Sequence, residues 1–390
     1  MEASTLSSQA LKGGPGRLAF LDVLRGAAIF MVVAIHAMGS ALRMDHFEWN
    51  GWWRDFAHAP RSLLLLTPVT LSWISVPIFI AVSGFCIHLS YERSPNKEWK
   101  PFFQRRFFRL YPPYLLALCF FTFVLPYTRY ADFTWKHLVH FGSHLFLIHN
   151  MNEHTAGSIN GSFWYLAVEA QLCLTYPLLL WVARRWGWGR SLLLAGGVEG
   201  TLRLGEACVG LPCCISTSPF FFWLSWGAGA KLADDYLHGR PLFLARWPLW
   251  IFVSLAFGAT LFRPTDAFGF LFAALMTVRI IAAGLTRPDN PVWSSLLARW
   301  LGGLGIFSYS LYLINQPFLN TFVQLMSQAF PGYAVHRLLL YFGELAACSL
   351  LFTISWLLYR WVELPSAAWG KRFVQRRSRA KTAVPAAYAG

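Results

Sequence analysis

The first long apolar segment of the chain, residues 18–42, reads LAFLDVLRGAAIFMVVAIHAMGSAL. A helix needs about 20 mainly apolar residues to cross the hydrocarbon core of a membrane, and this segment is long enough. Three ionisable residues interrupt it, namely Asp22, Arg25 and His36. Ionisable side chains are costly inside a membrane, and where they occur they usually mark a functional site. The segment therefore predicts a membrane-spanning fold and also indicates where its chemistry lies.

The composition of the whole chain agrees with a membrane protein. Of its 390 residues, 56% are hydrophobic and only 13% are charged, whereas soluble domains are about 45–50% apolar and about 25% charged. This composition excludes a disordered chain and argues against a soluble multidomain enzyme. The 19 Trp and 14 Tyr residues fit the aromatic belts that form at the two interfaces of a membrane.

Ten segments are predicted to span the membrane by their length and apolarity. They are 18–42, 70–91, 111–127, 163–183, 191–212, 218–232, 247–262, 267–285, 300–325 and 338–361. The segment 135–149 is too polar to span, and we expect it to be interfacial or re-entrant. The predicted fold is therefore all-α: a polytopic integral membrane protein with about ten transmembrane helices in one bundle. This bundle occupies residues 17–365, between a tail at 1–16 and a basic tail at 366–390.

The distribution of Lys and Arg predicts the orientation of this bundle. The formal net charge is +15. With the N-terminus inside the cell, 22 of the 33 Lys and Arg residues fall in cytoplasmic segments and seven in external ones. Cytoplasmic segments of membrane proteins carry such an excess. We therefore expect both termini in the cytoplasm of a bacterial cell, with the bundle in its cell membrane and no nucleic-acid partner. The basic tail could also contact anionic lipid.

The ionisable residues of the first segment share one side of its helix. Eleven residues separate Arg25 from His36, which is three turns plus about 20° of rotation and about 16 Å of rise. Asp22 falls in the same stripe, which is roughly 60° wide. Asp22 and Arg25 could form a capping pair or a topology anchor instead of a site. His36 needs buried polar partners at its depth, so it is the stronger candidate for chemistry.

Two later segments offer partners for His36. Glu169 and His36 each lie about six residues from the external end of their segments. We therefore expect the two at a similar depth, where Glu169 could orient the imidazole for general-base chemistry. A purely structural pair is the alternative. Tyr312 and Asn315 are i,i+3 neighbours that could join helices by hydrogen bonds or support the site.

The basic run at residues 105–109 reads RRFFR and precedes Pro112 and Pro113, which we take as the start of the third spanning helix. Arg106 and Arg109 share a helical face at i,i+3 spacing. Guanidinium groups bind phosphates through paired hydrogen bonds, and a helix N-terminus favours anions. The run could therefore bind a phosphate-bearing donor from the cytoplasm, or it could serve only as a topology anchor.

Six short motifs, in order along most of the chain, together resemble membrane acyltransferase family 3. They are Leu21–Gly26 with Val32–His36, Val76–Phe85, Arg105–Pro112, Trp164–Gln171, Ser308–Leu313 and Val362–Pro365. The resemblance implies an integral-membrane O-acyltransferase that moves an acyl group, often acetyl, from acyl-CoA to a hydroxyl group. The acceptors it implies are surface polysaccharides, glycolipids and small molecules such as antibiotics.

The resemblance also implies roles for individual residues. The essential His of the family corresponds to His36, its donor-binding Arg pair to Arg106 and Arg109, and its early Arg to Arg25. Asp22 would lie with the donor, and Arg105 and Trp164 are possible supporting residues. The late motif often has a His where this chain has Asn315, so His36 is left as the main imidazole candidate. Acyl-CoA is the expected co-substrate and no metal is expected.

These observations combine into a hypothesis and a rival. In the hypothesis, Arg106 and Arg109 bind the phosphates of acyl-CoA, whose extended pantetheine arm follows the stripe to His36. His36 then takes the proton of the acceptor hydroxyl. The rival is a proton-coupled transporter in which the ionisable residues of the spans relay protons. No inverted repeat supports the rival.

Overall fold

The structure is a computed structural model that describes residues 18–42, 71–94, 97–125, 134–330 and 336–383. All secondary-structure elements in this part of the chain are helices, and it contains no β-strand, which confirms the all-α prediction. Its longer helices are α2 (Ala19–Leu42), α4 (Ser75–Glu92), α5 (Trp99–Cys119), α6 (Trp135–Leu145), α8 (Trp164–Trp186), α9 (Trp188–Val209), α11 (Trp223–Leu237), α12 (Leu249–Ala259), α14 (Gly269–Thr286), α16 (Leu296–Ile306), α17 (Ser308–Ala329), α18 (Arg337–Leu358) and α19 (Leu364–Ala383).

Short helical turns join or extend these helices. The single-turn elements are η2 (Leu71–Ile74), η5 (His149–Met151), α7 (Glu153–Ala156), η6 (Gly161–Phe163), α10 (Cys213–Ser216), η7 (Pro219–Phe222), α13 (Arg263–Asp266) and α15 (Pro291–Ser294). Two π-helical turns, η3 (Phe120–Val124) and η9 (Tyr359–Glu363), continue α5 and α18. Through η9, α18 runs directly into α19.

Each of the ten predicted spanning segments contains a helix. Within the described residues, six helices are long and apolar enough to cross a membrane, or seven if α16 and α17 are counted as one broken span. Helices α9, α11 and α12 do not meet this criterion. The protein is therefore an all-α membrane protein with several transmembrane helices, but the predicted count of about ten crossings is not confirmed.

Two predicted spans differ from the structure, one in its start and one in its straightness. Helix α5 begins at Trp99, twelve residues before the expected start of the third span, and it contains Pro112 and Pro113 in its interior. Spanning helices tolerate Pro because neighbouring groups satisfy the carbonyls that it leaves unbonded. The ninth segment is likewise not one straight helix, because α16 and α17 meet at an angle of 81° next to Phe307.

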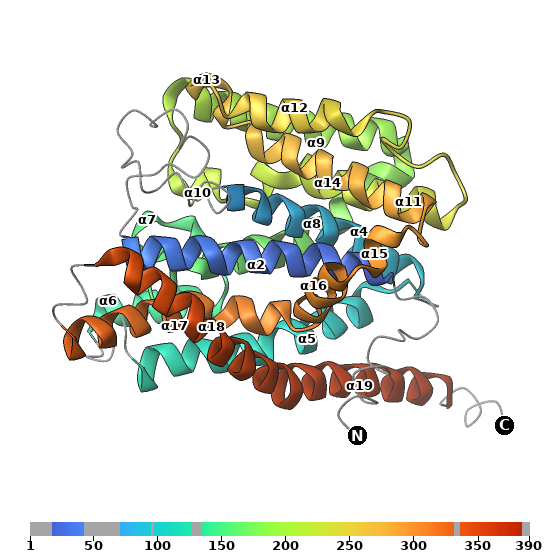
Figure 1. The fold of residues 1–390 in the computed structure, drawn as a ribbon. Helices are drawn as coiled ribbons and strands as arrows, with labels where there is room; N and C mark the ends of the chain where they lie inside the picture. Colours follow the sequence, from blue (N-terminus) through green and yellow to red (C-terminus); the bar gives the residue numbers. More distant parts are fainter. Residues whose placement is uncertain (1–17, 43–70, 95–96, 126–133, 331–335, 384–390) are drawn as a thin grey trace.

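Helix α2 lies in the middle of the bundle, in contact with α4, α16, α17 and α18 (Figure 1). Its closest neighbour is α16. A Cβ added to Gly26 would lie 1.7 Å from the carbonyl oxygen of Leu301, and one on Gly305 would lie 1.9 Å from that of Asp22. Small residues allow such close contacts between membrane helices. The contact fixes the position of the part of α2 that carries Asp22.

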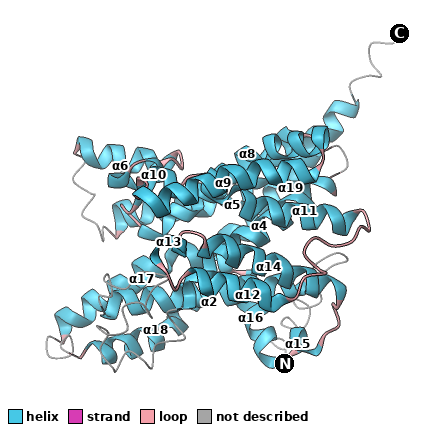
Figure 2. Ribbon diagram, turned by 90° about the horizontal axis from the view of Figure 1, so that it is seen from above, coloured by secondary structure: helices cyan, strands magenta, loops and turns pink. Residues whose placement is uncertain are grey.

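The bundle has two distinct ends. Helices α11, α15 and α19 lie at one end, and α6 lies at the other with the outer parts of α17 and α18, in both views (Figure 1, Figure 2). Helix α2 begins at the first end. We call it the basic end, because α19 and the start of α5 carry clusters of Lys and Arg there. Helix α19 packs along α5.

Candidate functional site

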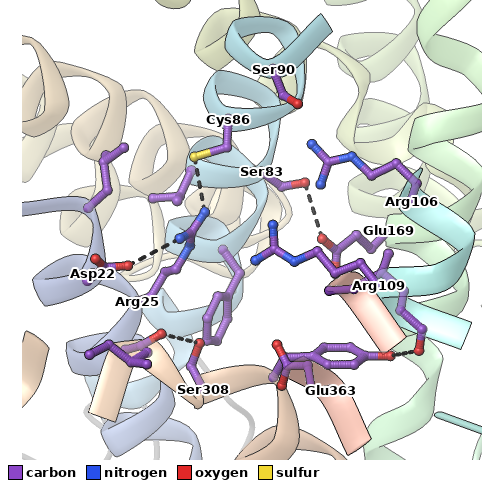
Figure 3. A pocket seen from close by; sticks show the side chains of 18 of the residues that line it. Asp22, Arg25, Ser83, Cys86, Ser90, Arg106, Arg109, Glu169, Ser308 and Glu363 are labelled. Carbon is purple, nitrogen blue, oxygen red and sulfur yellow. Dashed lines mark hydrogen bonds and ion pairs between the residues drawn. The ribbon is translucent and has the colours of Figure 1, made fainter. Parts of the chain in front are cut away.

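A cavity of about 600 Å³ opens at the basic end of the bundle, between α2, α4, α5, α8, α17 and the junction of α18 with α19 (Figure 3). Six of the predicted site residues line it, from four different helices: Asp22, Arg25, Arg106, Arg109, Glu169 and Tyr312. Residues more than 280 positions apart in the sequence therefore meet around one cavity. His36, Asn315, Arg105 and Trp164 do not line it.

The α2 side of the cavity carries an ion pair. Arg25 Nη1 lies 3.4 Å from Asp22 Oδ1, one turn earlier on the helix. Arg25 Nη2 also donates a hydrogen bond to Cys86 Sγ on α4, at 3.0 Å (Figure 3). The guanidinium group is thus held by two neighbours, and Asp22 balances its charge.

Glu169 on α8 faces the same space. Its Oε1 accepts a hydrogen bond from Ser83 Oγ on α4 at 3.3 Å (Figure 3), and Trp226 Nε1 donates to the same Ser83 oxygen at 3.4 Å. Ser83 lies one turn from Cys86, the partner of Arg25. Glu169 and Arg25 therefore lie at the same level of the bundle.

The basic run lies inside α5, two to three turns from its start, so the helix N-terminus is not part of the site. Arg106 and Arg109 line the cavity from this helix (Figure 3). Arg105 instead donates to Ser94 Oγ at 3.2 Å. The ring of Trp164, the other predicted supporting residue, packs 6.2 Å from that of Tyr165 and does not reach the cavity. The spacing of Arg106 and Arg109 thus predicted a shared face correctly.

A further acidic residue, Glu363, belongs to this site although we had not predicted it as a site residue. It lines the cavity, is 5% exposed, and accepts a hydrogen bond from Ser310 Oγ on α17 at 2.7 Å. The signal for it was present in the sequence. A lone carboxylate follows the last apolar segment, within the motif Val362–Pro365.

Three aromatic rings close the cavity on the side away from the basic end. The ring centroids of Phe79, Tyr165 and Tyr312 lie 5.7 to 6.2 Å apart, and all three residues line the cavity. Tyr312 is fixed by a hydrogen bond from its hydroxyl to the carbonyl of Ser162, at 2.7 Å. Tyr312 thus links α17 to the turn η6 by a hydrogen bond, in addition to lining the cavity.

His36 lies beyond these rings, one turn of α17 further from the basic end. Its Nδ1 lies 2.5 Å from Asn315 Oδ1. The amide of Asn315 donates to the carbonyls of Leu311 and Tyr312 at 3.1 and 2.8 Å, which turns its oxygen toward the imidazole. Because an amide oxygen only accepts, Nδ1 donates to it, an arrangement that in a neutral ring leaves the lone pair on Nε2.

The expected pairing of His36 with Glu169 was wrong, because Glu169 lies at the level of Arg25. The prediction equated the external ends of two apolar segments. Helix α8, however, begins inside the bundle, because the turn before it is bonded to the first part of α17. Tyr312 donates to the Ser162 carbonyl, and Asn160 Nδ2 donates to the Leu313 carbonyl at 3.0 Å.

One turn beyond His36 on α2, Ser40 donates a hydrogen bond to Glu344 on α18, a residue that is fully buried. His36 and Ser40, both partly exposed, are thus each held by a polar side chain of the neighbouring helix. Within the described residues, no three His, Cys, Asp or Glu side chains are grouped as a metal site requires.

Two buried imidazoles support the turn that precedes α8. The rings of His144 and His149 stack 3.9 Å apart and nearly parallel, next to Phe163. Burial, with the charge of His149 as a smaller cause, lowers the pKa of His144 to about 3, and burial lowers the pKa of His149 to about 4. Both rings are therefore neutral at physiological pH.

Comparison with known proteins gives one family and one relative. A family model described as "Acyltransferase domain" matches residues 18–362. Nodulation protein 10 of Rhizobium leguminosarum bv. viciae is 24% identical over 364 residues, which cover 83% of this chain and 92% of that protein. No solved structure matches the chain significantly.

Proposed function

The chain belongs to the acyltransferase domain family and is a membrane acyltransferase, and from this premise we propose that it transfers a short acyl group from acyl-CoA to an acceptor hydroxyl. The acceptor is a carbohydrate, a glycolipid or a small molecule. The basic end of the bundle faces the cytoplasm of a bacterial cell, where acyl-CoA is made. Acetyl is the acyl group that the family resemblance favours.

The charged cavity supports the donor half of this proposal. Three guanidinium groups, from Arg25, Arg106 and Arg109, line a space of about 600 Å³ that opens at the basic end. Guanidinium groups bind phosphate oxygens through paired, charge-assisted hydrogen bonds. The pyrophosphate of acyl-CoA would lie against Arg106 and Arg109, with its pantetheine arm directed along α2 toward His36. From Arg25 to His36, α2 rises about 16 Å, a length that an extended arm can bridge.

The hydrogen bond between His36 and Asn315 carries the catalytic half of the proposal. In this proposal the proton lies on Nδ1, facing the Asn315 oxygen, and Nε2 is the base. In the proposed step, Nε2 takes the proton of the acceptor hydroxyl while the hydroxyl oxygen attacks the thioester carbonyl carbon. The carbon–sulfur bond breaks, and the departing CoA sulfur receives the proton from Nε2. The products are the acyl ester and CoA, and His36 returns to its starting state.

The rings of Phe79, Tyr165 and Tyr312 lie between the cavity and His36, so the thioester reaches the base only when they separate. Glu169 is not the partner of His36 in this scheme. It lies beside Arg25 instead, where its carboxylate helps to orient the guanidinium groups around the donor.

The test is acyl transfer by His36→Ala in membranes. We expect His36→Ala to abolish transfer, measured as the acyl content of surface glycans and secreted metabolites in cells that make equal amounts of each variant. His238→Ala, which changes an imidazole outside the cavity at the end of α11, should leave transfer unchanged. Near-normal acylation by His36→Ala would refute the assignment of the base. A transporter would show no acceptor-stimulated release of CoA from acyl-CoA.

A further inference from the structure

Two basic residues from distant parts of the chain lie at the rim of the cavity. Arg93 directly follows α4, and Lys371 lies on α19. Ten residues of helix separate Arg93 from Ser83, and eight separate Lys371 from Glu363. These spacings correspond to rises of about 15 Å and about 12 Å. Arg93 and Lys371 therefore form an outer layer of the cavity, well separated from the inner layer around Glu169 and Glu363.

The two layers differ in charge. The three acidic residues among the described lining residues, Asp22, Glu169 and Glu363, all belong to the inner layer, where they balance guanidinium groups. The outer layer has no acidic lining residue in the described part of the chain. The acid nearest in sequence, Glu92, is bound to Lys97 at 2.6 Å and to Arg184 at 2.9 Å. The charged residues that line the rim in the described part of the chain are thus basic.

Lys371 is held at the rim by the packing of α19. Within one turn of it, Trp369 and Phe373 pack against Phe108 of α5, with ring centroids 4.6 and 5.6 Å away. Gly370 touches the same ring so closely that an added Cβ would lie 2.5 Å from Phe108 Cβ. This helix was expected only as a basic tail. Its packing instead makes it one side of the cavity opening.

We propose that Arg93 and Lys371 bind the 3′-phosphate of the donor nucleotide. This inference rests on the proposed function and extends it. Acyl-CoA carries two separate phosphate groups, a pyrophosphate and a phosphate on the 3′-oxygen of its ribose. If Arg106 and Arg109 bind the pyrophosphate, the 3′-phosphate lies further out, where the rim offers the remaining cations of the cavity. The protein therefore selects acyl thioesters of a 3′-phosphorylated nucleotide over acyl-pantetheine groups that lack it.

The experiment measures binding of CoA and of 3′-dephospho-CoA to the purified full-length protein, so that no acceptor is needed. Wild-type protein should bind CoA about tenfold more tightly, which corresponds to one charge-assisted contact. Lys371→Ala and Arg93→Ala should each weaken CoA binding several-fold and leave 3′-dephospho-CoA binding unchanged. Lys371→Arg should keep the preference. Arg372→Ala, which changes the next residue of α19 outside the cavity lining, is the matched control.

The possible outcomes separate this proposal from the proposed function. Equal affinity of the wild-type protein for both nucleotides, or equal losses for both in the rim variants, would overturn the rim assignment and leave the donor in place. Failure of the wild-type protein to bind either nucleotide would overturn acyl-CoA as donor, and the rim assignment with it. If Lys371→Ala changed only retention on vesicles of anionic lipid, the rim would be a lipid contact and the proposal wrong.

Discussion

The two halves of α2 face different surroundings. Its first half, with Asp22 and Arg25, borders a hollow lined by charges of both signs. Its second half packs against α17 and α18, where His36 contacts the amide of Asn315 and Ser40 donates to the carboxyl group of Glu344. A hollow lined by charged groups suits a ligand that enters and leaves, whereas a fixed pair suits a group that must keep one orientation. In the proposed function, donor binding and catalysis therefore belong to different halves of one helix.

The largest expected effect comes from the packed half. Asn315→Leu removes the acceptor that holds the proton of His36 on Nδ1, so the ring can adopt the tautomer in which Nε2 is no longer a base. Loss of tautomer control in a catalytic His lowers kcat strongly, and we expect a fall of about a hundredfold with the KM for the acyl donor unchanged. Acyl transfer under saturating donor measures it.

Asn320→Leu, which changes a second Asn of α17 outside the site, should keep normal activity. Asn315→Asp, which retains an acceptor at the same place, should restore much of what Asn315→Leu loses. A normal kcat for Asn315→Leu would show that the packed half does not control the base.

The second prediction tests the helix that both halves share. In Gly26→Ala, the new Cβ would overlap the carbonyl of Leu301, so α2 and α16 must move apart. Overpacking of this kind costs about 1–3 kcal/mol. We expect a lower apparent Tm in detergent and less folded protein in the membrane, measured by thermal unfolding of purified samples.

Gly303→Ala on α16 is the matched control, because its Cβ would meet nothing within 4 Å. Replacing a helical Gly by Ala there should be neutral or stabilise the protein by up to about 1 kcal/mol. Equal behaviour of the two variants would show that the α2–α16 contact does not hold the site together.

The placement of site residues within single helices could be predicted from their spacing in the sequence. The contacts between residues of different helices could not. Helical periodicity placed Asp22, Arg25 and His36 on one side of α2, and the i,i+3 spacing placed Arg106 beside Arg109. The partner of His36 was missed because depth had been judged from the ends of apolar runs. That rule fails where a chain folds back into the bundle before its helix begins, as it does before α8.

The role of Asn315 could not be predicted for a related reason. As a departure from the family motif it appeared to be a lost imidazole, and only the structure shows that it contacts His36, across 279 positions of sequence. The rim residues depend on packing as well, because nothing in a basic C-terminal stretch predicts that Gly370 and Trp369 will dock it on α5.

The third prediction removes two guanidinium groups of α5 from the cavity that borders the first half of α2. Arg106→Ala combined with Arg109→Ala should raise the apparent KM for acyl-CoA about tenfold or more, because each guanidinium group contributes charge-assisted hydrogen bonds to phosphate. The kcat should change much less, in contrast to Asn315→Leu. Arg105→Ala belongs to the same basic run but faces Ser94, and it should leave the KM unchanged. An unchanged KM in the double variant would reduce Arg106 and Arg109 to topology anchors.

The smallest expected effect concerns the support of the packed half at His144 and His149. In the folded protein His149 stays neutral down to a pH of about 4, and His144 down to a pH of about 3. In the unfolded chain, by contrast, a His takes up a proton near pH 6.5. The unfolded state therefore binds more protons as the pH falls below 6.5, and stability declines from there toward pH 4. The apparent Tm should fall by several degrees over this range.

The His149→Phe variant should show a smaller decline of the Tm with falling pH. His154→Phe, which changes an exposed ring nearby, should show the same decline as the wild-type protein. A pH-independent Tm in the wild-type protein would show that the stacked pair does not bear on the start of α8.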